Sequence, residues 1–131
     1  MQMKSLQVHG EVTSLDVDVF DHEKMFIDRI LNPLIQKLSH LKVVMEHITT
    51  KDAIDFILSC DERFVAPTIA PQHLVLNKNA LFQGGLQPYN YCLPALKREI
   101  HRHEIISTVT SGSKRFFLRT DSAPHERKKN E

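Results

Sequence analysis

Histidine is the residue type that most readily suggests chemistry in this sequence, because eight histidines occur among 131 residues. Only His101 and His103 lie close together in the chain. On a strand, a spacing of two puts both rings on one face, where they could hold one metal ion, whereas on a helix it points them apart. We expect a helix here and therefore predict no metal site. The other six histidines are scattered without ligand spacing: His9, His22, His40, His47, His73 and His125.

Acidic and hydroxyl side chains give no stronger indication of a site. Asp16 and Asp18 alternate along an expected strand and could face one cation, but no third ligand is near them in the sequence. His101 and Glu104, three residues apart, more commonly form a surface hydrogen bond than an acid–base pair. The sequence contains no serine-hydrolase, phosphate-loop or zinc-protease motif. We predict no catalytic residue and no cofactor, and lean against an enzyme.

Charge is distributed unevenly along the chain. Residues 1–64 hold seven Lys and Arg against eleven Asp and Glu, whereas residues 65–131 hold ten against five. A basic half can attract phosphates, although a basic surface is more often simply solvated. The predicted nucleic-acid-binding side chains are six basic residues of the second half: Lys97, Arg98, Arg102, Lys114, Arg115 and Arg119.

A short helix followed by a hairpin would carry these side chains. The helix is expected over 93–103, where Pro94 suits the first turn. Residues 104–110 and 115–120 are rich in β-branched and aromatic side chains and are separated by a polar loop containing Gly112, which predicts two antiparallel strands. The outline resembles half of a winged helix.

The longest periodic signal lies in the acidic half. Apolar residues recur every three or four positions from Asp21 to Ile48, which predicts one amphipathic helix. Pro33 is expected to kink this helix rather than end it. A second helix is predicted from Thr49, which could form a capping box with Asp52, to about residue 61. The two helices would form a layer, and the first would join two copies of the chain into a homodimer.

The remaining segments predict shorter elements. Alternation of apolar and polar residues over 5–20 indicates extended structure, either a small hairpin or one edge strand. Proline and glycine punctuate residues 64–91, and within them 71–83 fits a helix nearly as well as a hairpin. In the helical case, 71–83 and the basic helix would form a helix-turn-helix.

Length and composition bound the organisation of the chain. A sequence of 131 residues, 41% of them hydrophobic, can form one compact domain. We predict this domain over 1–120 and a disordered basic tail over 121–131. No apolar run is long enough to cross a membrane and the first residues lack an apolar signal core, so we expect a cytoplasmic protein without membrane contact. Cys60 and Cys92 have no partners at metal spacing and are expected to be free thiols.

These patterns predict an α+β fold in which a long kinked helix and a short helix pack on short antiparallel strands. The predicted function is a small nucleic-acid-binding or regulatory protein, of the DNA-binding kind, that holds phosphates with its basic helix and hairpin. The alternative is a protein-interaction module or assembly subunit without catalytic activity, in which the basic residues are incidental. A metal-assisted hydrolase built from His101, His103 and nearby acids is the least favoured function.

Overall fold

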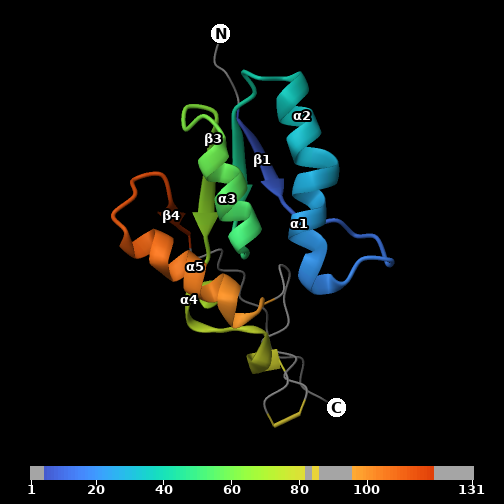
Figure 1. The fold of residues 1–131 in the computed structure, drawn as a ribbon, viewed down its shortest axis with the longest axis vertical. Helices are drawn as coiled ribbons and strands as arrows, with labels where there is room; N and C mark the ends of the chain where they lie inside the picture. Colours follow the sequence, from blue (N-terminus) through green and yellow to red (C-terminus); the bar gives the residue numbers. More distant parts are fainter. Residues whose placement is uncertain (1–4, 82–83, 86–95, 120–131) are drawn as a thin grey trace, which may run out of the picture.

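Four parallel strands form the sheet in the part of the chain that the structure describes. The computed structural model describes residues 5–81, 84–85 and 96–119. The strands lie side by side in chain order, and every neighbouring pair is parallel: β1 (Leu6–His9), β2 (Val43–Glu46), β3 (Val65–Ile69) and β4 (Phe117–Leu118). Parallel neighbours require a crossover connection, usually helical, and the helices lie in these connections (Figure 1).

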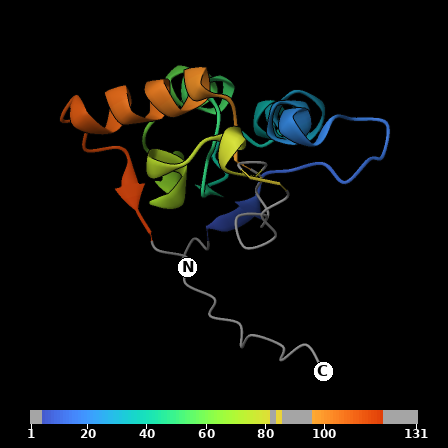
Figure 2. The same ribbon diagram turned by 90° about the horizontal axis from the view of Figure 1, so that it is seen from below.

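Each connection between strands contains helical turns. Between β1 and β2 run η1 (Val19–Asp21), α1 (His22–Phe26), the π-helical turn η2 (Ile27–Leu31) and α2 (Asn32–Lys37). Between β2 and β3 runs α3 (Lys51–Ser59), and between β3 and β4 run α4 (Gln72–Val75), η3 (Lys78–Leu81) and α5 (Glu99–Thr110). Helices α1–α2, α3 and α5 lie on the same side of the sheet (Figure 2).

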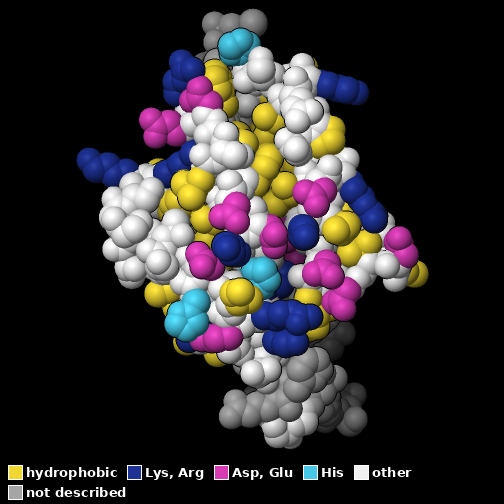
Figure 3. All heavy atoms as spheres, viewed as in Figure 1, with side chains coloured by type: hydrophobic (Ala, Val, Ile, Leu, Met, Phe, Trp, Pro, Cys, Tyr) yellow, Lys and Arg dark blue, Asp and Glu magenta, His cyan; other side chains and the backbone are white. Residues whose placement is uncertain are grey.

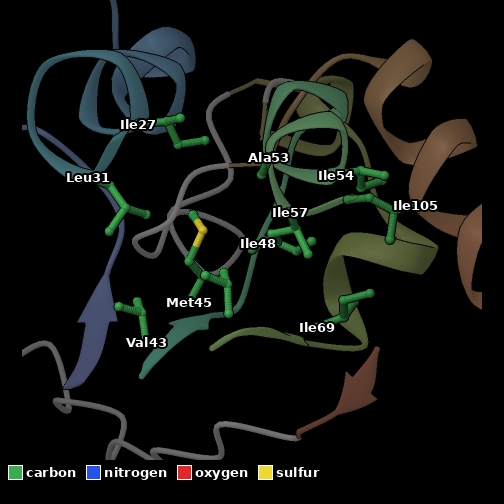
Figure 4. Packing of buried hydrophobic residues seen from close by; sticks show 11 residues of the cluster. Ile27, Leu31, Val43, Met45, Ile48, Ala53, Ile54, Ile57, Ile69 and Ile105 are labelled. Atoms are coloured by element: carbon green, nitrogen blue, oxygen red, sulfur yellow. The ribbon is translucent and has the colours of Figure 1, made fainter. Parts of the chain in front are cut away.

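The hydrophobic core fills the space between these helices and the strands. Val43 and Met45 of β2 are buried, because alternate residues of a strand face opposite sides of its sheet. They pack in one cluster with Ile57 of α3 and Ile105 of α5 (Figure 4). The sheet is therefore covered by helices on its apolar face, and its other face carries the half-buried positions of β2 and β3.

The predicted antiparallel, winged-helix-like arrangement is wrong. Residues 104–110 belong to α5 instead of a strand, since Ile105 is fully buried in the core and tertiary packing outweighs β-propensity. The hydroxyls of Thr108 and Thr110 donate to carbonyls four residues earlier in the same helix. Phe117–Leu118 does form a strand, but it pairs with β3 in parallel.

The predicted helix from Asp21 to Ile48 is wrong beyond Lys37. The helix ends at Leu38. Residues Val43–Glu46 form β2 instead, because Val43 and Met45 are buried in the core while the strand pairs with β3. Pro33 does not end the helix. A wider π-turn precedes Pro33, and in it the Asn32 N–H donates to the Ile27 carbonyl. This turn lets the helix continue although proline has no N–H to donate. The homodimer through residues 21–48 stays a prediction.

Two shorter predictions are confirmed and others are revised. The second helix exists as α3, although Thr50 instead of Thr49 is its N-cap and accepts from the Ala53 N–H at 3.1 Å. Among the described strands, β1 pairs with β2 alone and is the predicted edge strand. Residues 72–81 form two short helices, α4 and η3, and not one continuous helix or a hairpin. The basic helix begins at Glu99.

Some expectations lie outside the described residues, among them the start of the predicted basic helix at 93–95, Cys92 and the tail 121–131. Cys60 forms no disulfide with a described residue. Within residues 5–81, 84–85 and 96–119, no helix is long and apolar enough to cross a membrane.

A buried ion pair ties the segment before α5 to the segment after β1. Lys97 Nζ lies 3.4 Å from Glu11 Oε1, and the two side chains are only 2% and 4% exposed. The second carboxylate oxygen of Glu11 is buried and accepts no hydrogen bond from the described part of the chain. Removing one partner of such a pair leaves a buried charge without compensation.

We therefore predict that Lys97→Met lowers the free energy of unfolding by about 3–5 kcal/mol. The double variant Lys97→Met/Glu11→Gln should recover much of this loss, because it removes both charges. Urea denaturation of both variants measures the difference, with Arg98→Met, at an exposed neighbouring position, as the control. A Lys97→Met protein as stable as the wild type would contradict the prediction.

Candidate functional site

Two histidines meet where β1 and β2 end. His9 is the last residue of β1, and His47 directly follows β2. Nδ1 of His9 lies 2.9 Å from Nε2 of His47, and the rings meet edge to face with their centroids 4.6 Å apart. One ring must donate an N–H to the lone pair of the other, or both lone pairs can face one cation. The carboxyl ends of parallel strands are the usual place for sites in β/α folds.

The backbone of His47 is held in a strained conformation. Its φ of 41° lies in the left-handed region, which residues other than glycine rarely adopt. The His47 N–H donates to Thr68 Oγ1 at 2.8 Å, and the Thr68 hydroxyl donates to Glu46 Oε2 at 2.9 Å. The other oxygen of Glu46 accepts from Arg119 at the end of β4. A chain of contacts across three strand ends therefore fixes this residue, as strained residues at functional sites require.

The site combines an open side and a buried side. The His9 residue is exposed, whereas His47 is 9% exposed. His73, which follows β3, is 3% exposed, and burial, the Lys97 ammonium and His47 together lower its pKa to about 3. Its Nε2 is buried without a hydrogen-bond partner among the described residues. His73 is therefore a buried side chain that is uncharged at neutral pH.

The residues weighed as metal ligands from the sequence lie elsewhere. Nδ1 of His101 accepts the Lys51 N–H at 3.0 Å, and burial lowers the pKa of this ring. His103 is 75% exposed beside Glu99 on another face of α5, so the two rings point apart, as expected on a helix. Asp16 and Asp18 are exposed and lie in no strand. Among the described residues, no three His, Cys, Asp or Glu side chains form a metal-binding group.

The six basic side chains chosen from the sequence are largely engaged in internal contacts. Lys97 is buried against Glu11, and Arg119 pairs with Glu46. The guanidinium of Arg102 binds Glu99 and the Leu74 carbonyl, and that of Arg115 binds the Cys60 and Val65 carbonyls. Arg98 and Lys114 are exposed.

The surface does not favour a phosphate-binding role for these residues. On the helical face of the molecule, Lys and Arg are interspersed with Asp and Glu (Figure 3). Phosphate binding by the six side chains stays a prediction. Four of them could bind a phosphate only by giving up contacts inside the protein.

Sequence reasoning missed the His9–His47 pair. The two residues are 38 positions apart, which no ligand motif spans. The available signal was that each histidine closely follows a short segment with apolar residues two positions apart, Leu6 and Val8 in one case and Val43 and Met45 in the other. With both runs assigned to neighbouring parallel strands, the two rings would have been expected at the same edge of the sheet.

We predict that His47→Gly is more stable than His47→Ala by about 1 kcal/mol, because glycine adopts a positive φ without steric strain. The matched control is His9, whose φ is not positive: there glycine should be the less stable substitution. Thermal or urea unfolding of the four variants measures this. Equal stability of the two His47 variants would show that the strain is absent in solution.

We also predict a pH-dependent contribution from His73. Because its folded-state pKa of about 3 lies below its unfolded value of 6.5, the unfolded chain binds the proton more readily. The stabilising contribution is therefore present above pH 6.5 and is lost as the pH falls toward 3, with a slope of up to about 1.4 kcal/mol per pH unit. His73→Gln should flatten this part of the stability profile, and a profile parallel to that of the wild type would contradict the prediction.

Comparison with known proteins gives consistent relatives. No family model matches the chain. It is 67% identical over 130 residues to the mitochondrial dihydroorotase of Arabidopsis thaliana and 59% identical over 126 residues to the dihydroorotase of Nitrosomonas eutropha. These alignments cover 99% and 96% of this chain but 34% and 36% of the relatives. The chain thus spans about a third of the length of the curated relatives it matches.

Solved structures agree with these relatives. A crystal structure of dihydroorotase from Campylobacter jejuni superposes with a TM-score of 0.83 at 31% identity, over 92% of this chain and 34% of that one. The dihydroorotase of Saccharomyces cerevisiae in complex with 5-fluoroorotic acid gives 0.79 at 29% identity, over 94% and 36%. Both neighbours have a TIM-barrel-like amidohydrolase fold.

The comparisons overturn the function predicted from the sequence. Relatives at 54–67% identity are named dihydroorotase, which is an enzyme of pyrimidine biosynthesis. The expectation of a nucleic-acid-binding regulator is therefore wrong, and so is the leaning against an enzyme. Over nearly its whole length, this chain is similar to one third of a dihydroorotase, and the His9–His47 pair lies within that third.

Proposed function

We propose that this chain forms part of the β/α barrel of a dihydroorotase, and that His9 and His47 belong to its reaction centre. The observation that carries the proposal is the convergence of the two imidazoles at the carboxyl ends of adjacent parallel strands, where barrel enzymes hold their catalytic groups. The substrate class would be a cyclic amide related to orotate, because one structural neighbour was solved with 5-fluoroorotic acid.

The donor set of the pair fits a metal ion such as Zn²⁺. Imidazole nitrogen is a common zinc ligand, and two such nitrogens on one tetrahedral ion lie roughly 3.4 Å apart. The two nitrogens, at 2.9 Å, would need to separate by only about half an ångström to reach that spacing. When bound, such an ion supplies a nucleophilic water at neutral pH and polarises the carbonyl of an amide.

The chain's own residues would hold and orient this centre. His9 and His47 provide two ligands, whereas catalytic zinc usually has three from the protein, so further ligands would come from outside the described residues. The Thr68 hydroxyl holds the His47 backbone and is itself held by Glu46. Arg119, paired with Glu46, would extend this support to the end of β4. Rigid support of this kind keeps ligands in productive geometry.

A chimera tests the proposal directly. We predict that the Arabidopsis dihydroorotase retains dihydroorotase activity when its matching third is replaced by this chain, since 67% of those positions are identical. In the chimera, His47→Ala should lower kcat/KM by more than about 100-fold. Losing a residue that only supports a metal ligand costs up to about 100-fold, and losing the ligand itself should cost more. The control is His103→Ala, at an exposed position on α5, which should leave activity unchanged.

Metal binding by the chain itself provides the second measurement. Calorimetric titration with Zn²⁺ should show binding that His9→Ala and His47→Ala weaken and His103→Ala does not. An inactive chimera that is folded, or an active chimera indifferent to His47→Ala, would refute the proposed role of the pair.

The location and partners of the protein are also proposals. The sequence predicts a cytoplasmic location, whereas the relatives from Arabidopsis thaliana and Oryza sativa are named mitochondrial. Fractionation of cells that express the tagged protein decides between the two compartments. A protein partner and a homodimer through 21–48 stay predictions from the sequence.

A further inference from the structure

A buried carboxylate of α1 reaches the turn that follows His47. Glu23 is 2% exposed, and both of its oxygens accept hydrogen bonds from Thr49 and Thr50. The Thr49 N–H lies 2.9 Å from Oε2 and the Thr50 N–H 3.0 Å from Oε1, while each hydroxyl lies 2.7 Å from one of the two oxygens. Two consecutive residues therefore give all their polar hydrogens to one side chain.

The chemistry of this contact requires an acid. A carboxylate only accepts hydrogen bonds and has lone pairs for about four donors, which matches two N–H groups and two hydroxyls. Burying a charge without such partners is unfavourable, so the contact is stable only while the turn keeps its conformation. The carboxylate also lies at the N-terminus of α3, where the helix dipole favours negative charge.

The same helix also contacts the chain beside His9. A Cβ atom added at Gly10 would lie 3.4 Å from the Phe26 ring and 3.5 Å from the end of Met45. Phe26 is three residues after Glu23, so the two side chains lie on neighbouring positions of one face of α1. This helix therefore touches the residue after His9 with one side chain and the residues after His47 with another.

We propose that Glu23 is a positioning residue that fixes the His47 imidazole opposite His9. The left-handed backbone of His47 is not favoured locally, and the Glu23 contacts hold the residues just beyond it. Loss of the carboxylate lets the turn relax, and the His47 ring then leaves its partner. This inference rests on the proposed function, in which the His9–His47 pair forms the reaction centre.

The test compares matched variants of the full chain without metal. Glu23→Gln keeps the size of the side chain, but either placement of its amide NH₂ puts a donor against a backbone N–H. Thr49→Val removes one hydroxyl contact and Thr49→Ser keeps it. Asp28→Asn changes an exposed acid of the same helical segment and is the control.

The first readout is the nitrogen–nitrogen scalar coupling across the His9–His47 hydrogen bond, measured by NMR on ¹⁵N-labelled protein. We expect the coupling in the wild type, Thr49→Ser and Asp28→Asn, and its loss in Glu23→Gln and Thr49→Val while backbone spectra remain those of a folded protein. A coupling that persists in Glu23→Gln, or that is absent from the wild type, overturns the proposal. If Glu23→Gln does not fold, the pair of Thr49 variants decides.

The second readout is Zn²⁺ affinity, which should fall on the order of tenfold in Glu23→Gln, at the lower end for outer-shell partners. Unchanged affinity in the folded variant counts against positioning. A wild type that shows the coupling but binds no Zn²⁺ refutes the metal centre of the proposed function, while the NMR result still decides the role of Glu23.

Discussion

The in-register parallel pairing of β1 with β2 is the constraint on which the site depends. This register places His9, the last residue of β1, opposite Glu46, the last residue of β2. His47 directly follows β2 and therefore lies next to the end of β1. The pairing of β2 with β3 continues the register and brings Thr68 to the same edge, where it binds both Glu46 and the His47 N–H. A slip of one residue would turn every side chain of a strand to the opposite face. The buried, alternating Val43 and Met45 oppose such a slip, so the apolar core sets the geometry of the polar edge.

The carboxyl edge of the sheet is polar in a way that the rest of the core is not. Glu23, His73 and Lys97 are all buried there or close to it, although burying charged and polar groups is unfavourable unless they are hydrogen-bonded or paired. Glu23 meets this requirement completely, whereas a Glu11 oxygen and His73 Nε2 have no hydrogen-bond partner among the described residues. Buried polar groups without a hydrogen-bond partner in the described part of the chain, like strained residues, call for a functional explanation.

Part of the fold could be predicted from the sequence and part could not, for physical reasons. The amphipathic start of the first helix and the threonine-capped α3 were accessible because both depend on local periodicity and capping. Strand β2 was not, because Leu41, Met45 and Ile48 keep helical spacing while Val43 and Met45 also keep strand spacing. Pro67 in β3 made that strand look like a loop. In residues 104–110, burial of Ile105 outweighed a composition typical of strands. Local signals of this kind cannot settle segments whose structure depends on distant packing.

The candidate site was still less accessible than the fold, because its members share no local pattern. His9 and His47 become neighbours only when two short strands are known to be parallel and adjacent. Glu23 looks in the sequence like any acid in the first turn of a helix, where it would normally face water. Its partners are donors that become available only when the chain turns between β2 and α3. The basic residues chosen from the sequence were misleading for the same reason. Arg115 and Lys97 bind partners inside the protein. The sequence alone does not show whether a charged side chain binds such a partner or a ligand.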